Sequence, residues 1–425
     1  MVKNFLTVLG CLIVLSTYAQ NGTISPYSSF GIGDTRSNGT VENRMMGGQQ
    51  QYADSIHINL RNPAAYAKLR LTTYTIGISH REFQLRDNIE TQRTSVTNLD
   101  YLAVAFPLGK KIGVGFGLQP FTSVGYELVS ETLNNAQDTV TNVFTGTGGL
   151  NRVFLSLGFE PIKNIALGGT VNYSFGNLEY QRIQSVENVQ LGTLDRRLSR
   201  INGFDLNFGA NYTPRIGKKH TLFTHFGADT QVNLVAENRE RIGSFSLTNG
   251  AEIEAFDVDL EAQGLRNTEI KIPTRYTFGL GFGLEKKWFL GAEYSTQELS
   301  TFENSFLGQD NVTYADASTL SVGGYFVPNY AALSGIFNRI TYRTGLRYDQ
   351  TGLVVDGREI NNLGITFGLG VPITGTGTDR FSNLNIGFEL GRRGTRAAGL
   401  LEESYLNVSI GLSLNDQWFV KRRIN

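Results

Sequence analysis

The hydrophobic pattern of this chain is dominated by short stretches in which apolar and polar residues alternate strictly. The clearest one, Arg275 to Glu285, reads RYTFGLGFGLE, with an aromatic residue or leucine at every second position. A period of two places successive side chains on opposite faces, which is the geometry of a β-strand. After a turn at residues 285–287 the pattern returns through residues 288–295. We therefore predict a hairpin with one apolar face and one face of glycine, hydroxyl groups and charge.

The same pattern predicts about fourteen strands, beginning at Leu71 and following one another in pairs. The predicted strands are Leu71–Leu85, Asn98–Phe106, Lys111–Leu128, Thr147–Phe159, Asn164–Leu178, Ile201–Tyr212, Thr221–Val232, Pro273–Leu284, Lys287–Ser295, Thr319–Val327, Ile340–Asp349, Asn361–Val371, Phe381–Gly391 and Tyr405–Leu414. The alternation is best kept in the last five strands.

The connections between these strands alternate between short and long. The long ones include Gly125–Gly146, Glu179–Arg200, Asn233–Ile272 and Gln297–Ser318, and prolines 107, 161, 214, 328 and 372 fall at the short ones. Tight turns on one rim and long loops on the other are typical of an outer-membrane barrel. Aromatic residues near the short turns, Phe106, Phe159, Tyr212, Trp288 and Phe326, fit an interfacial girdle.

The pattern thus predicts an all-β protein, a transmembrane antiparallel β-barrel of about 14 strands. A large secreted β-sandwich or propeller also shows one-faced alternation. We favour the barrel because the strand count is even, loop lengths alternate and no blade-length repeat is present. The lumen of such a barrel is too wide for wall side chains to fill. It must conduct water or hold a plug.

The N-terminal part of the chain differs from the predicted strands. Lys3, the apolar run 5–15 and the small residues before Gln20 indicate a secretory signal peptide over residues 1–19. The only cysteine, Cys11, lies inside that run, which argues against a lipoprotein and leaves the processed chain without a thiol. Residues 20–70 show no sustained period, so we predict an N-terminal hatch, or plug, followed by a barrel over residues 71–425.

Composition excludes several classes of function. The chain has 38 basic and 38 acidic residues, so no global field attracts nucleic acid. Beyond the signal peptide no apolar run approaches the length of a membrane helix. The four histidines are scattered without carboxylate clusters, and the glycine-rich runs are strand interiors and not phosphate loops. We expect no metal site, no cofactor and no enzymatic activity.

Short motifs add a family resemblance to this picture. Asn62-Pro63-Ala64 and the stretch Arg44-Met45-Met46-Gly47-Gly48 lie in the predicted hatch, and Gln119-Pro120 interrupts the third strand. With fourteen strands and an end reading WFVKRR, the chain resembles the FadL-type outer-membrane transporters of long-chain fatty acids and aromatic hydrocarbons, in the form common in Bacteroidota. Asn62, Pro63 and Ala64 match the family's hatch signature, and Gln119 and Pro120 are at the place of its lateral wall gap.

This resemblance implies passive uptake of a small hydrophobic compound. The compound would be captured among the outer loops, pass the hatch and leave sideways through the wall into the membrane. The family's capture loops correspond here to Glu179–Arg200 and Asn233–Ile272, both of which are polar.

Residues on the predicted lumen face have two interpretations. The charged set includes Arg343, Arg347 and Glu389, and the aromatic set is Phe154, Phe223, Phe289 and Tyr325. They could anchor the hatch, or they could bind a ligand, with the two arginines as carboxylate partners. The sequence favours anchoring for the charges and does not decide for the aromatic residues.

Two functions from different classes remain open. The first is the uptake channel, with outer-membrane lipids and a hydrophobic small molecule as partners. The alternative is an accessory FadL-like barrel subunit of a multiprotein secretion or assembly machine, bound to other outer-membrane or periplasmic proteins. A general porin is disfavoured because residues 20–70 would occlude the lumen. All of these hypotheses place the protein in the cell outer membrane.

Overall fold

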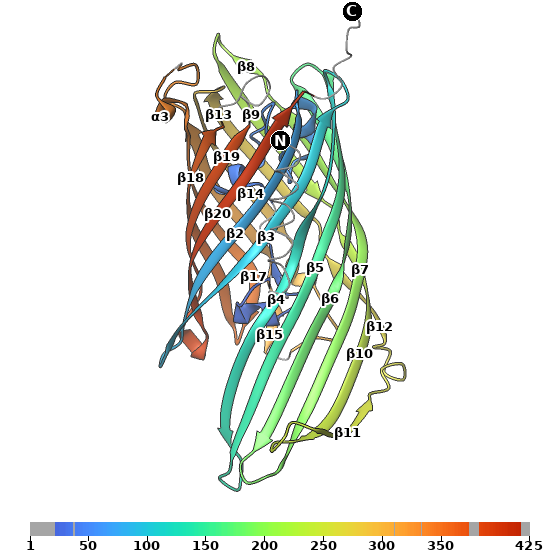
Figure 1. Cartoon of the computed structure of the whole chain (residues 1–425). Coiled ribbons are helices and arrows are strands. Elements are labelled where there is room, and N and C mark those ends of the chain that lie inside the picture. The colour runs from blue at the N-terminus through green and yellow to red at the C-terminus, as the bar shows by residue number, and fades with distance from the viewer. Residues whose placement is uncertain (1–21, 37–38, 310, 333, 374–381, 418–425) are drawn as a thin grey trace, which may run out of the picture.

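The computed structural model describes residues 22–36, 39–309, 311–332, 334–373 and 382–417. The predicted signal peptide and the terminal WFVKRR motif lie outside the described residues. The described chain forms a closed antiparallel β-barrel with a short N-terminal segment of mixed structure (Figure 1).

In the first half of the chain the wall strands β2 to β7 are each a single continuous element. The remaining strands follow in chain order. The elements are β2 (Thr72–Arg86), β3 (Thr91–Pro107), β4 (Ile112–Leu133), β5 (Thr139–Ile162), β6 (Ile165–Val186), β7 (Leu191–Tyr212), β8 (Arg215–Ile216), β9 (His220–Asp229), β10 (Val232–Ser246), β11 (Glu252–Asp257), β12 (Asn267–Ile272), β13 (Arg275–Leu284), β14 (Trp288–Gln297), β15 (Val312–Tyr314), β16 (Ala317–Phe326), β17 (Thr341–Val355), β18 (Arg358–Pro372), β19 (Asn383–Gly394) and β20 (Glu402–Asp416).

Three wall strands are each built from two elements. β9 and β10 form one wall strand, because both pair with β7. β12 and β13 form the next one, because β12 pairs with β10 and β13 pairs with β9. β15 and β16 form the third, because both pair with β17. Counted in this way the wall has fourteen strands, and the pairing of β2 with β20 closes it. Closure matters because a free edge would leave backbone N–H and C=O groups unsatisfied in lipid.

Strand register and burial confirm that the wall has an apolar outer face and a polar inner face. On β13, the side chains of Phe278 and Leu280 are 52% and 59% exposed on the outside of the barrel. Thr277, the residue before Phe278, is buried on the lumen side. The predicted girdle residues Phe159, Tyr212 and Phe326 are likewise exposed near the short turns. The apolar face therefore points outward in the membrane-spanning part of the wall, as the alternation predicted.

All fourteen predicted strands are present, but the predicted long loops were partly wrong. Most of Gly125–Gly146 and Glu179–Arg200 is strand, because β4 to β7 extend as long ribbons beyond the other strands (Figure 1). The predicted loop Asn233–Ile272 contains β10, β11 and β12. Both faces of a sheet beyond the membrane meet water or polar loops, so no strict apolar alternation marks these extensions.

Short helices occur in the described part of the N-terminal segment and in the connections between wall strands. They are η1 (Pro26–Ser29), α2 (Val41–Arg44), η2 (Pro63–Lys68), η3 (Leu299–Thr301), α3 (Ile336–Arg339) and η5 (Ala397–Gly399), with the short strand β1 (Asp34–Thr35) between the first two. No described helix is long and apolar enough to span a bilayer.

We predict that Leu280→Arg strongly destabilises the barrel. Leu280 lies near the middle of β13 on the outer face, and an arginine at the bilayer midplane costs about 2–4 kcal/mol. The free energy of unfolding should be measured by urea titration in liposomes.

The matched control is Leu247→Arg, because Leu247 is also exposed but lies in the connection after β10, outside the barrel wall. A change within about 0.5 kcal/mol is expected there. Equal losses for both variants would contradict the assigned lipid face.

Candidate functional site

The barrel interior is occupied by residues 22–36 and 39–70, here called the N-terminal segment. Most of its described side chains are buried, and its short elements η1, β1, α2 and η2 contact strands from several parts of the wall. The segment has little regular structure, as its aperiodic sequence predicted. Its backbone polar groups therefore depend on side chains and on the wall for hydrogen bonds.

The predicted motif Asn62-Pro63-Ala64 starts the helix η2. Pro63 occupies the first helical position, where its fixed φ suits the helix and no donor is lost. The Asn62 side chain donates to the Gln50 carbonyl (2.9 Å) and to Oδ1 of Asn211 on β7 (3.0 Å). The motif thus ties one loop of the segment to itself and to the wall.

Glycines on the inner wall let the segment approach closely. A Cβ at Gly168 of β6 would lie 2.3 Å from the Pro63 carbonyl carbon, and one at Gly345 of β17 would lie 2.2 Å from the backbone nitrogen of Gly47. On the strands β18 and β19, Gly368 and Gly387 leave the space that Met45 fills. The inward glycines of the alternating pattern therefore make room for backbone, which no larger residue permits.

Buried ionic and polar contacts hold the middle of the segment. Arg44 pairs with Asp100 of β3 at 2.5 Å, and Arg36 reaches the same carboxylate at 3.2 Å. Glu42 accepts hydrogen bonds from Asn385 (2.8 Å) and Ser413 (2.7 Å) on β19 and β20. Breaking such a buried pair by removing one partner typically costs about 3–5 kcal/mol, so these contacts fix the segment in place.

On the opposite side of the barrel, Glu293 of β14 performs a similar task. Its carboxylate accepts from the Gln50 backbone N–H at 2.6 Å and from the Gln50 side chain at 3.3 Å. The sequence did not reveal Asp100 or Glu42 as anchors, since nothing in the local pattern shows which charges meet inside the barrel.

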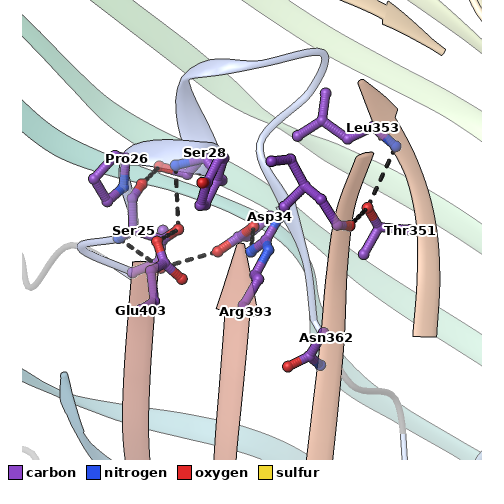
Figure 2. A network of polar contacts seen from close by, with 12 residues as sticks. Ser25, Pro26, Ser28, Asp34, Thr351, Leu353, Asn362, Arg393 and Glu403 are labelled. Atoms are coloured by element: carbon purple, nitrogen blue, oxygen red, sulfur yellow. Dashed lines mark hydrogen bonds and ion pairs between the residues drawn. The ribbon is translucent and has the colours of Figure 1, made fainter. Parts of the chain in front are cut away.

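The first turns of the segment are joined to the outer part of the lumen. Figure 2 shows Ser25 capping η1 and donating to Glu403 of β20, with Asp34 beside Arg393 of β19. The Arg393 guanidinium donates to Asp34 at 2.5 Å. The segment therefore contacts the wall in the outer part of the lumen as well as near Asp100.

The predicted lumen charges are linked mainly to other wall residues. Arg347 pairs with Glu389 of β19 and with Asp349, each at 2.9 Å. Arg343 donates to Asn385 at 2.9 Å, and Asn385 in turn donates to Glu42 of the segment. These residues face the lumen in two groups, one around Arg347 and one around Arg343. Arg343 is connected to the segment through Asn385.

The predicted lumen aromatic residues form two packing sites for the segment. Phe223, Phe289 and Tyr325 surround Tyr52, with ring centroids 5.7, 5.0 and 5.0 Å away, and the two tyrosine hydroxyl groups are 3.1 Å apart. Phe154 belongs to a separate cluster that contains Tyr66. Two tyrosines of the segment therefore pack against these aromatic residues: Tyr52 against the first set and Tyr66 beside Phe154.

The lumen contains a cavity of about 400 Å³ with many charged lining residues. Its charged lining residues are Asp34, Arg36, Arg61, Arg81, Arg152, Asp205, Asp229, Arg275, Arg347, Asp349, Arg393 and Glu403. Burial and the neighbouring Arg81 lower the pKa of Arg36 to about 10. Apolar side chains such as Phe121 and Phe302 are interspersed, but they do not make this a predominantly apolar ligand pocket.

The wall contact between β3 and β4 is incomplete. Their pairing extends only from Leu102↔Leu118 to Pro107↔Gly113, and a bulge follows between Pro120 and Thr122 on β4. Gln119 is buried, and Pro120 has no N–H to donate to a neighbour. The interruption at Gln119-Pro120 thus coincides with the end of the ladder between these two strands.

The N-terminal segment covers part of this incomplete contact. β1 pairs with Thr122 and Ser123 of β4, and the Arg36 backbone N–H donates to the Phe121 carbonyl at 3.0 Å. The Gly22 carbonyl accepts from Asn98 of β3 at 3.0 Å. Among the described residues, no group of three or more histidine, cysteine or acidic side chains is placed to hold a metal.

We predict that Gly168→Ala loosens the N-terminal segment and makes the barrel leak. The new methyl group would meet the Pro63–Ala64 backbone, and overpacking of this kind costs about 1–3 kcal/mol. Ion conductance in planar bilayers should rise relative to the unaltered protein. Gly169→Ala is the control, because its nearest neighbour is 3.8 Å away; a leak in both variants, or in neither, would refute the fit.

We predict that docking of the segment around His57 weakens as the pH rises. Burial by itself lowers the pKa of His57, but the Asp54 carboxylate 2.6 Å away outweighs it and raises that pKa above 6.5. A raised pKa contributes stability that is complete below pH 6.5 and is lost as pH rises through the raised value. Hydrogen exchange of residues 54–60, corrected for intrinsic rates, should therefore quicken across this window.

The control for this pH effect is His57→Gln, which removes the titrating group. Exchange in that variant should show no such step above pH 6.5. A step of equal size in the variant would show that another group is responsible.

Comparisons with known proteins agree with this architecture. The fold is similar to the Pseudomonas putida toluene transporter TodX (15% identity, 92% of this chain and 100% of that chain, TM-score 0.60) and to a Pseudomonas aeruginosa FadL homologue (13%, 91% and 100%, 0.56). The CymD monoaromatic hydrocarbon channel is also similar (12%, 91% and 99%, 0.54). These likenesses confirm the predicted FadL-type fold.

The sequence comparisons give the family. A search of curated proteins found no match. The sequence model described as BamG matches residues 1–425, which is the full length of the chain. The protein therefore belongs to the BamG family.

Proposed function

We propose that this protein is an accessory barrel subunit of a machine that assembles proteins in the outer membrane. In this role the N-terminal segment acts as a permanent plug, and the barrel acts as a membrane-embedded scaffold for partner proteins. The protein requires no turnover, cofactor or moving ligand for this function.

The observation that carries the proposal is the way the lumen is filled. The segment is fixed by buried ion pairs at Asp100, by Glu42 and Glu293, and by backbone contact with inward glycines. Moving it would expose several of these charges and polar groups without partners, at a cost of several kcal/mol. A barrel with so many buried links to its plug is better suited to a scaffold than to a gate.

The remaining cavity supports the same conclusion. A hydrophobic compound gains about 25 cal/mol for each Å² of apolar surface that it buries against apolar surroundings. Here it would meet Arg36, Arg61, Arg81 and Arg275, and it would have to strip water from them. The cavity is thus a poor site for a fatty acid chain or an aromatic hydrocarbon.

The family match and the external shape agree with a role in assembly. The match to the family model BamG covers the whole chain, and we take it as a hint of an assembly role. The ribbons β4 to β7 and β10 extend past the rest of the wall on the long-loop side (Figure 1). Such an extension gives a partner protein a rigid surface outside the membrane.

Uptake of a small hydrophobic compound is the second candidate, and one observation favours it. The β3–β4 ladder ends at Leu118, next to the bulge at Pro120, where a lateral exit would lie. The channels with similar folds include a toluene transporter and a monoaromatic hydrocarbon channel. In this role the segment would have to move away from Thr122 and Ser123 of β4 to open the exit.

A disulfide between the segment and β4 separates the two functions. A Cβ built on Gly22 lies 2.8 Å from Cβ of Ser123, so G22C/S123C can form a disulfide after a shift of about 1 Å. The processed chain has no other cysteine if the signal peptide is removed, which makes the bond unique. Oxidation would lock the segment across the proposed exit.

We predict that the locked protein is fully functional. In cells depleted of the wild type, the amounts of other outer-membrane barrels should fall, and oxidised G22C/S123C should restore them as well as the wild type does. Quantitative proteomics of outer membranes measures this, with the single-cysteine variants as controls. Unchanged barrel levels on depletion, together with hydrocarbon uptake that the lock abolishes and a reductant restores, would support the uptake channel instead.

A further inference from the structure

The turns on the short-turn rim of the barrel are strongly basic. In the described parts of the five turns that follow β3, β5, β7, β13 and β16, nine residues are basic and one, Glu285, is acidic. The basic residues are Lys110, Lys111, Lys163, Arg215, Lys218, Lys219, Lys286, Lys287 and Arg339. None of them forms an ion pair within the described chain. The Lys287 ammonium donates to the Pro328 carbonyl, and its positive charge is not neutralised by that contact.

The opposite rim has the reverse charge. In the described connections on the long-loop side, ten residues are acidic and two are basic. The acidic residues are Asp87, Glu90, Asp138, Glu187, Asp259, Glu261, Glu298, Glu303, Asp316 and Asp356, and the basic ones are Arg266 and Arg396. A chain with no net charge is therefore polarised across the membrane.

Four lysines of the basic rim lie on neighbouring turns. Lys218 and Lys219 are in the turn before β9, and Lys286 and Lys287 are in the turn between β13 and β14. Because β9 pairs directly with β13, the two turns are adjacent on the rim. We call Lys218, Lys219, Lys286 and Lys287 the lysine cluster. Like charges so close together repel unless an anion lies among them.

Aromatic contacts place the lysine cluster at the level of the membrane interface. Lys287 lies 5.3 Å from the ring centroid of Phe326, and the neighbouring His220 stacks on Phe282 at 5.1 Å. Both of these phenylalanines are exposed on the outer, lipid-facing side of the wall. Aromatic rings at this height are typical of the headgroup region, so the cations beside them reach headgroup phosphates.

The loop between β16 and β17 points to the same environment. It contains Phe337, whose side chain is 72% exposed. Tyr342, which lies on the lipid-facing side of β17, donates its hydroxyl hydrogen to the Phe337 carbonyl at 3.2 Å. Lys286 lies 5.1 Å from the ring of Tyr330 in this loop. An exposed apolar residue beside cations matches a lipid interface, which offers acyl chains and phosphates together.

We propose that the lysine cluster binds the phosphate groups of anionic phospholipids in the periplasmic leaflet of the outer membrane. Short turns face the periplasm in barrels of this kind, and each basic residue near an anionic membrane surface adds about a fivefold preference. The ammonium groups act as point charges toward phosphate, without the geometric demands of an arginine fork. The site lies outside the lumen and holds whether the barrel serves as a scaffold or as a channel.

The test uses the full-length protein in detergent, titrated separately with cardiolipin, phosphatidylglycerol and phosphatidylethanolamine. Native mass spectrometry measures the lipid bound at each concentration. The wild type should bind the two anionic lipids at least about fivefold more tightly than phosphatidylethanolamine. K218Q/K219Q/K286Q/K287Q should lose most of that preference, and raised salt should weaken it in the wild type.

The matched control is R239Q/R266Q/K271Q/R396Q, which removes four positive charges on the long-loop side. It should keep the wild-type preference. Folding of each variant is checked by heat modifiability on gels, and K218Q/K219Q, which should lose part of the preference, serves if the fourfold variant fails to fold.

Equal binding of all three lipids by the wild type would overturn the proposal. An equal loss in the control variant would also overturn it, because net charge and not the cluster would then set the preference. If the wild type shows no lipid preference but an acidic polypeptide such as polyglutamate binds and depends on the cluster, the partner is a protein and the lipid site is refuted.

Discussion

The closed hydrogen-bonded wall is the constraint on which the rest of this structure depends. Lipid offers no partner to a backbone N–H or C=O group, so every strand must pair on both sides or be covered. β2 meets β20 over its whole length, whereas the β3–β4 ladder stops early. The N-terminal segment uses backbone and side-chain groups at that place, which shows that the interior and the wall are one hydrogen-bonded system.

A fourteen-stranded wall creates an interior that must be filled. Inward glycines bring the backbone of the segment against the strands, and inward carboxylates at Asp100 and Glu293 receive its donors. Each feature alone is common in proteins. Together they produce a lumen whose cavity has many charged lining residues, and this is why we favour a scaffold over a conduit for hydrophobic molecules.

The two rims show how the same barrel distinguishes its two environments. The membrane-spanning part of the wall is apolar on the outside toward both rims, so lipid contact alone does not orient it. Charge does, since the short turns carry lysine and the long connections carry glutamate and aspartate. An uncharged total therefore conceals a strong polarity that becomes visible only when the residues are sorted by rim.

The sequence by itself determined the wall. Strict alternation in stretches such as 275–285 predicted the number, order and outward face of the strands, because a period of two records which side of a strand meets lipid. It also predicted an aperiodic segment in the lumen, glycines that make room for it, and the irregularity at Gln119-Pro120.

Tertiary structure decided what meets inside the barrel and where the strands end beyond it. The pairing of Arg44 with Asp100, and the enclosure of Tyr52 by Phe223, Phe289 and Tyr325, join positions far apart in the chain. Strand extensions in residues 233–272 carry no alternation, because both of their faces lack lipid. Periodicity reports the solvent on each side of a strand, whereas the partner of an inward charge depends on barrel register and on the path of the N-terminal segment.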